Sequence, residues 1–179
     1  MTLTIAQLDT MPEAEAAFKL AACCGSAKWV EGMVARRPFQ TREGLLAASD
    51  EVAMTLHPID WLEAFSHHPR IGEQNSRAAV SAAASDWSKG EQASASRATE
   101  DTRSALAEAN AEYEKKFGFI FIISANGRRA DEILAALRER LSNEPDAEIF
   151  IAAREQQQIT RLRLEKLVSA SRAPGVARP

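Results

Sequence analysis

A histidine beside a proline is the residue of this sequence best suited to proton transfer. An apolar pattern predicts a helix that starts at Pro58 and ends near His67, and His68-Pro69 follow at once. Because proline disfavours α geometry in the preceding residue, we expect His68 just past the helix C-terminus. There the helix dipole would favour the charged imidazole, which suits a proton donor. The alternative is a His68 that only caps the helix, with His67 still on it as an exposed or supporting residue.

The segment Ser88-Lys89-Gly90-Glu91-Gln92 predicts the start of a long helix, expected over about 88–116. Ser88 and Glu91 have the spacing of a capping box, in which each side chain bonds the other's backbone. That structural explanation is sufficient by itself. The same geometry would also serve a site, because free amides at a helix N-terminus bind a small anion or polar ring. Glu91 could then pair with a histidine and hold its proton in place.

An arginine points along the apolar face of the last helix, which we expect over about 145–170. At about 100° per residue, Arg163 falls on that apolar line and Arg161 on nearly the opposite face. A core-facing guanidinium needs an anionic partner. The partner is either a helix carboxylate in a buried ion pair or a substrate carboxylate, held in a bidentate manner. The line consists of Ile149, Ala152, Gln156, Ile159, Arg163 and Leu167.

An apolar segment, Phe121-Ile122-Ile123-Ser124-Ala125, lies between turn signals. We expect extended or irregular backbone here, followed by a turn at Asn126-Gly127. Most such runs are part of a hydrophobic core. If the backbone is irregular, its amides could also line a pocket.

Metal-binding and nucleotide-binding patterns are missing from the sequence. Three histidines and the adjacent pair Cys23 and Cys24 give no recognised ligand spacing. No P-loop, Gly-x-Gly-x-x-Gly or Gly-x-Ser-x-Gly pattern occurs either. We therefore expect no metal and no cofactor, so that side chains alone carry the chemistry. Adjacent cysteines in a helix do not easily form a disulfide, which is typical of a reducing cytosol.

Composition indicates one all-α domain. The chain has 179 residues, and helix formers dominate while β-branched runs are nearly absent. We expect a single-domain bundle of about seven to nine helices over residues 1–171 and a flexible tail over 172–179. In the helix at 128–141, the apolar residues form one stripe opposite the charges. Other helices are expected at 12–24, at 26–36, from a Thr41 cap to about 56, and more weakly at 76–85.

Charge and hydropathy exclude two classes of partner. The formal net charge is −3, so no global field would recruit nucleic acid. No apolar run approaches the roughly 20 residues that span a bilayer. The N-terminus has neither a basic start nor an apolar signal core, and we therefore expect a cytoplasmic protein.

Taken together, these segments resemble the 2-oxo-4-hydroxy-4-carboxy-5-ureidoimidazoline (OHCU) decarboxylase family. The resemblance extends over roughly residues 10–170. Ser124 stands where many members have cysteine, and Arg70-Ile71-Gly72 resembles a bacterial variant of the motif. The matching segments are HHPRIG at 67–72, SKGEQ at 88–92, KFGFIFIISANGR at 116–128 and EIFIAAREQQQITRLRLEKL at 148–167, with WVEGMVARRPF at 29–39.

The resemblance implies an all-α enzyme, often a homodimer, that forms (S)-allantoin from OHCU in the last step of urate breakdown. It makes His68 the proton donor, and Glu91 and Arg163 essential polar groups. The substrate is a small urate-derived anion. The implied substrate contacts are Pro69, Ser88, Gln92, Phe121, Ile122, Ile123, Ser124 and Ala125.

The chemistry agrees with the residues. The carboxylate of OHCU is attached to a carbon whose ring neighbours can absorb the electron pair as CO2 departs, so no electron-sink cofactor is needed. Two other functions remain open at this point. A non-catalytic interaction module would keep His68, Glu91 and Arg163 far apart. A hydrolase of the preceding intermediate would need an activated water and a general base.

Overall fold

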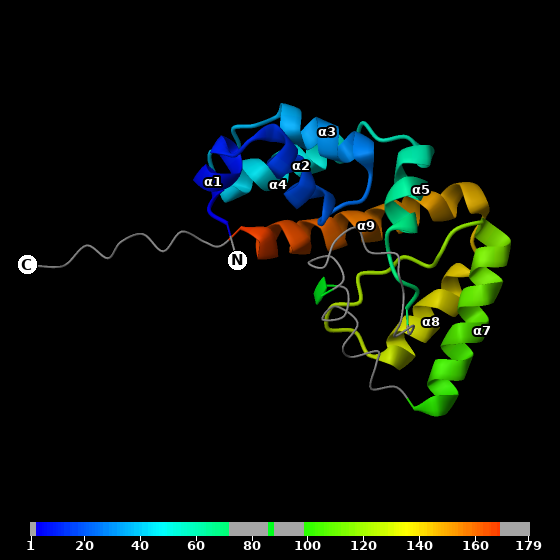
Figure 1. The fold of residues 1–179 in the computed structure, drawn as a ribbon. Helices are drawn as coiled ribbons and strands as arrows, with labels where there is room; N and C mark the ends of the chain where they lie inside the picture. The colour runs from blue at the N-terminus through cyan, green and yellow to red at the C-terminus, as the bar shows by residue number, and fades with distance from the viewer. Residues whose placement is uncertain (1–2, 72–85, 88–98, 169–179) are drawn as a thin grey trace, which may run out of the picture.

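The computed structural model describes residues 3–71, 86–87 and 99–168, and these residues form an all-helical fold (Figure 1). Its described part contains eight helices, which confirms the predicted fold class. The weak helix expected at 76–85 and the tail expected at 172–179 lie outside the described residues. The helices are α1 (Ile5–Thr10), α2 (Glu13–Ala21), α3 (Ala27–Ala35), α4 (Arg42–Ala53), α5 (Pro58–Ser66), α7 (Glu100–Phe117), α8 (Ala130–Arg140) and α9 (Pro145–Leu167).

The longest helix, α9, runs through the middle of the molecule (Figure 1). It packs against α4, α5 and α7, which come from widely separated parts of the sequence. The amide of Leu3 donates to the carbonyl of Leu167 at 2.8 Å and so joins the start of the described chain to the end of α9. The buried face of α9 is therefore where side chains from distant segments meet.

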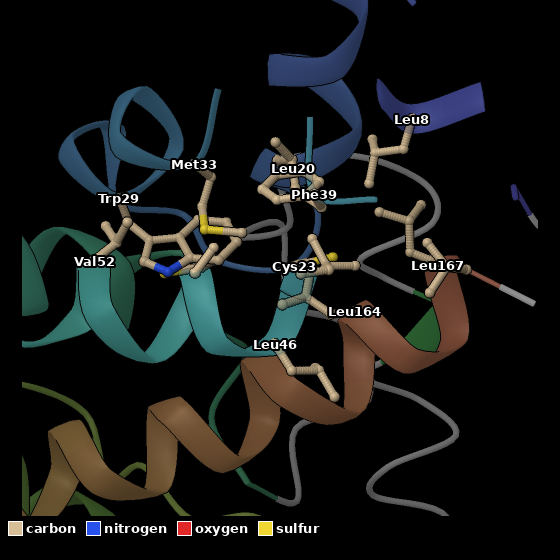
Figure 2. Close-up of a cluster of buried hydrophobic side chains, with 14 of the residues drawn as sticks. Leu8, Leu20, Cys23, Trp29, Met33, Phe39, Leu46, Val52, Leu164 and Leu167 are labelled. Carbon is tan, nitrogen blue, oxygen red and sulfur yellow. The ribbon is translucent and has the colours of Figure 1, made fainter. Parts of the chain in front are cut away.

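One hydrophobic cluster holds the N-terminal helices on the C-terminal half of α9 (Figure 2). Leu20, Trp29 and Met33 from α2 and α3 are at most 1% exposed, and Leu164 of α9 packs against them. Burying a large apolar side chain of this kind stabilises a fold by about 1.5–3 kcal/mol. The cluster fixes the α2–α3 turn against α9, close to the predicted site.

The segment 118–127 lies between the other two clusters and contains neither helix nor strand, in line with the expected extended or irregular backbone. Phe121 and Ile123 pack with α7 and α8, whereas Ile122 packs with α5 and α9. Successive side chains of extended backbone point to opposite sides, so a fully buried segment must be apolar on both. The predicted turn follows at Asn126 and Gly127, where Gly127 has a φ of 79°.

Helix ends follow the predicted caps with two differences. Thr41 caps α4 by accepting from the amide of Gly44 at 2.9 Å, but α4 ends at Ala53 rather than near 56. The hydroxyl of Thr55 donates to a backbone carbonyl in the last turn at 2.8 Å and closes the helix there. Similarly, α2 ends at Ala21 rather than 24.

The first helix, α1, was not predicted. Thr4 and Gln7 form a reciprocal capping box at its start, and their spacing in the sequence is the signal of this helix. The long helix expected from 88 is described from Glu100 as α7, with Thr99 as its cap; residues 88–98 lie outside the described part. Among the described helices, none is long and apolar enough to cross a membrane.

Candidate active site

A partly enclosed pocket lies where the end of α5, the extended segment and α9 meet. It brings together His68, Pro69 and all five residues of the 121–125 segment. Leu162 and Ile159 close it from α9. The complete lining in the described residues is His68, Pro69, Ile71, Phe121, Ile122, Ile123, Ser124, Ala125, Asn126, Ile159 and Leu162.

The helix end that carries His68 forms as expected. Pro58 occupies the first turn of α5, and Asp60 accepts from the amide of His57 at 2.8 Å. The helix ends at Ser66, and the amide of His68 donates to the carbonyl of Phe65 at 3.0 Å. His68 itself is only partly exposed.

The protonation state expected for His68 is wrong. Burial, and then the positive charge of Arg163, lower the pKa of His68 to about 3. The dipole of the helix that ends at His68 favours the charged ring, but the surrounding protein disfavours it more strongly. The imidazole is therefore neutral at pH 7 in the ligand-free protein.

The predicted phase of the last helix is confirmed. Arg163 is 4% exposed, whereas the side chain of Arg161 is 52% exposed and contacts Asp50 at 3.4 Å. Arg163 does not itself line the pocket, but its charge acts on His68 and on Cys24. The positive charge of this buried guanidinium thus reaches the pocket through His68.

A row of buried polar side chains extends along the same face of α9. Gln156 is fully buried, and its Nε2 donates to Oγ1 of Thr160 at 3.1 Å. Thr160 also interacts with the thiol of Cys24 and lowers its pKa, but burial raises that pKa to about 11. Cys23 and Cys24 are both buried thiols. Gln156 was expected on this face from helix periodicity, but no role was predicted for it.

The backbone of the 121–125 segment is held by α8 and α9. The amide of Ser124 donates to Oε2 of Glu155 at 2.7 Å, and the carbonyl of Ile122 accepts from Arg140 at 2.8 Å. The segment is buried in the hydrophobic core and also lines the pocket, so its interpretation as core and its interpretation as pocket wall are compatible. The expectation of available amides needs a correction, because Glu155 already occupies the amide of Ser124.

A buried ionic network anchors this wall. Glu148 is fully buried and accepts from Arg140 Nε at 2.7 Å and from Asn143 Nδ2 at 2.6 Å. The Tyr113 hydroxyl also donates to Glu148, and burial raises the pKa of this phenol. The guanidinium of Arg140 lies over the ring of Phe121, 4.5 Å from its centre. Arg140 is the last residue of α8 and is buried. The expectation that the charged residues of α8 lie opposite its apolar stripe is therefore wrong for Arg140.

Three predicted site residues, Ser88, Glu91 and Gln92, lie outside the described residues. Their roles stay predictions. Within the described ranges, no group of three or more histidine, cysteine, aspartate or glutamate side chains could hold a metal ion.

Comparison with known families decides where the chain belongs. The family model described as OHCU decarboxylase matches residues 9–165, which is most of the chain. The chain belongs to the OHCU decarboxylase family. The match covers the helix end with His68, the extended wall and the buried face of α9.

The relatives differ in how much of their length the chain covers. The chain is 35% identical to the OHCU decarboxylase of Amia calva, over 74% of this chain and 75% of that protein. It is 43% identical to the uric acid degradation bifunctional protein TTL of Arabidopsis thaliana, over 82% of this chain but 45% of the relative. A bifunctional protein of Bacillus sp. TB-90 is 27% identical and is covered over 32% of its length. The chain thus spans less than half of either bifunctional protein.

Solved structures support the same fold. A crystal structure of an OHCU decarboxylase in the presence of (S)-allantoin has a TM-score of 0.74 and 38% identity, over 86% of this chain and 99% of that one. The structure of an (S)-allantoin synthase has a TM-score of 0.71 at 22% identity, which supports the fold alone.

Proposed function

We propose that the chain decarboxylates OHCU to (S)-allantoin in urate degradation, without a cofactor. The observation that carries this proposal is the pocket in which His68, Pro69 and the 121–125 wall meet beside Arg163. The family to which the chain belongs supports the same reaction.

Anion binding is the first task of such a site. Arg163 is buried, and its positive charge extends to the pocket histidine. In a water-poor pocket the attraction between a guanidinium and a carboxylate is much stronger than in bulk water. We propose that Arg163 holds an anionic group of OHCU while the apolar wall excludes water from the ring.

Loss of CO2 then needs charge stabilisation and one proton. As the carbon–carboxylate bond breaks, its electron pair moves into the ring, and a proton must be added to a ring carbon to give allantoin. His68 lies at the pocket and is the titratable side chain among the described lining residues. Delivery of the proton from one side sets the (S) configuration.

The neutral state of His68 in the ligand-free protein fits this sequence of events. A substrate anion beside the ring offsets the charge of Arg163 and raises the imidazole pKa. Protonation of His68 would therefore accompany substrate binding. We propose that Glu91 orients this proton and that Ser88 and Gln92 contact the substrate, as the family resemblance implies.

The alternatives receive less support. A non-catalytic module was expected to keep its polar groups on separate surfaces, whereas His68 and Arg163 act on each other. A hydrolase would need a general base that activates water. The family to which the chain belongs favours decarboxylation over hydrolysis.

The direct test follows freshly generated OHCU by circular dichroism with and without the protein. The proposal predicts rapid appearance of the (S)-allantoin signal with release of CO2. Spontaneous decay gives the same constitution without chirality. Loss of OHCU at the spontaneous rate, or a racemic product, would contradict the proposal.

We also propose that the protein is a cytoplasmic homodimer that binds neither nucleic acid nor membranes. An apolar groove between α2 and α3 supports an interface, because Phe18 at its edge is 60% exposed. Light scattering of the purified protein tests this. A monomeric mass at micromolar concentration would contradict the dimer.

A further inference from the structure

We propose that Gln156 is a positioning residue for His68, which presents its amide oxygen to the imidazole and fixes the tautomer of the ring. This inference rests on the proposed role of His68 in proton delivery. It assigns a role to a residue that lines neither the pocket nor the surface.

The orientation of the Gln156 amide is fixed by its neighbours. The side chain is fully buried, and Nε2 donates to Oγ1 of Thr160, one turn further along α9, at 3.1 Å. Thr160 is 3% exposed, and its side chain also interacts with Cys24. Rotation of the amide by 180° would break the hydrogen bond from Nε2 to Thr160. Oε1 is therefore held on the side away from Thr160.

The oxygen Oε1 needs a donor at that side. It is buried, and among the described residues no group completes a well-formed hydrogen bond to it. A buried acceptor without a donor costs free energy, so it attracts any nearby N–H. The side chain of Gln156 interacts with His68 and raises the pKa of the imidazole. An interaction raises the pKa of the imidazole only if the ring N–H donates in it, and Oε1 is the acceptor of the Gln156 amide.

The other groups that face His68 act in the opposite direction. Arg163 of α9 and the adjacent His67 both lower its pKa, and burial lowers it further. Gln156 is thus the described side chain that favours an N–H on the ring. It would hold a proton on one nitrogen and leave the other nitrogen for the substrate.

Substitutions of Gln156 by methionine and by glutamate distinguish a role in positioning the His68 ring from a role in packing the core. Gln156→Met keeps the length and burial of the side chain but removes the acceptor. Gln156→Glu keeps an acceptor and adds a negative charge beside the ring. Gln158→Met is the matched control, because Gln158 is exposed on the same helix.

The decisive measurement is the ¹⁵N resonance pattern of His68 in the ligand-free protein, over a pH series. In the wild type we expect one tautomer and a neutral ring down to about pH 5. Gln156→Met should give a mixture of tautomers, and Gln156→Glu should move the titration of His68 upward by a pH unit or more. The inference is overturned if the tautomer pattern and the titration are the same in all folded variants. If Gln156→Met does not fold, Thr160→Val replaces it in the test. This variant removes the acceptor of Nε2 and should also give a mixture of His68 tautomers, with a smaller share of the second tautomer.

Activity gives the second readout. Gln156→Met should lower kcat about 10-fold or more with little change in KM, because a hydrogen bond to a charged group is lost after substrate binds. Gln158→Met should leave both unchanged. An equal loss in both variants would also overturn the inference. If the wild type itself lacks decarboxylase activity, the proposed function fails, whereas the resonance pattern still decides whether Gln156 positions His68.

Discussion

Arg163 of α9 lies close enough to His68, at the end of α5, for its positive charge to lower the imidazole pKa. Two positive charges at this distance repel each other, so the charged imidazole is disfavoured beside the charged guanidinium. A bound anion would remove this conflict and favour both charged forms. The pair is therefore suited to bind a carboxylate and to acquire a proton with it.

Arg163 and Arg161 form a matched pair of probes on one helix. Arg163→Ala should lower kcat/KM by at least about 100-fold, because a bidentate contact to the substrate anion is lost. Arg161→Ala should leave activity within about twofold, since that side chain is half exposed and contacts Asp50 at 3.4 Å. Steady-state kinetics with fresh OHCU checks both. Equal losses would mean that the buried guanidinium has no special role.

Because the pKa of His68 is low in the folded protein, we predict that the folded state loses stability as the pH falls. The unfolded chain binds a proton on this ring near pH 6.5, whereas the folded protein does so only near pH 3. The folded state thus binds fewer protons in this window, so its stability falls as the pH drops from 6.5. The slope for one such proton is at most about 1.4 kcal/mol per pH unit.

Urea unfolding between pH 4 and 7 measures this slope. Replacing His68 with asparagine should flatten it, whereas replacing the exposed His57 should not. Identical slopes in the wild type and the His68→Asn variant would contradict the lowered pKa.

Gly25, in the turn between α2 and α3, gives the ring of His67 its space. A Cβ at this position would lie 2.3 Å from Cδ2 and 2.7 Å from Cβ of His67. Gly25→Ala should therefore destabilise the protein by about 1–3 kcal/mol and reduce activity, because the displaced ring precedes His68.

The double variant Gly25→Ala, His67→Gly provides the control, because it removes the clashing atoms. It should recover most of the stability and activity relative to Gly25→Ala. Thermal melting and OHCU turnover measure the two effects. Failure of the second substitution to rescue either property would show that Gly25 acts in another way.

Glu148 is the buried anion on which the pocket wall depends. Glu148→Ala should lower the free energy of unfolding by about 3–5 kcal/mol, because it leaves Arg140 buried without its carboxylate. Glu100 is the matched exposed carboxylate: it pairs with Arg103 at the surface, so Glu100→Ala should cost less than about 1 kcal/mol. Urea unfolding at pH 7 compares the two, and similar losses would contradict the account of the network.

Local rules were sufficient for the parts of the site that depend on one helix. The effect of Pro69 on the residue before it located the end of α5, and periodicity placed Arg163 inward and Arg161 outward. Both follow from backbone geometry alone.

Tertiary partners explain what could not be predicted. The pKa of His68 depends on Arg163 and on burial by other elements, neither of which the local helix dipole includes. Arg140 was expected at the surface, yet it is 8% exposed because Glu148, in another helix, offers it a buried carboxylate. Gln156 lies on the apolar line of the last helix together with Arg163. A second polar residue on that line was the sequence signal that Gln156 has a role at the site.

The measurement that tests the central claim most directly is the circular dichroism of allantoin formed from fresh OHCU by wild-type protein and by the His68→Asn variant. A positioned proton donor contributes about 10²–10⁴-fold to a rate. We predict a loss of that size in stereoselective (S)-allantoin formation while the melting temperature stays near that of the wild type. Near-wild-type turnover with unchanged chirality in the folded variant would contradict the account.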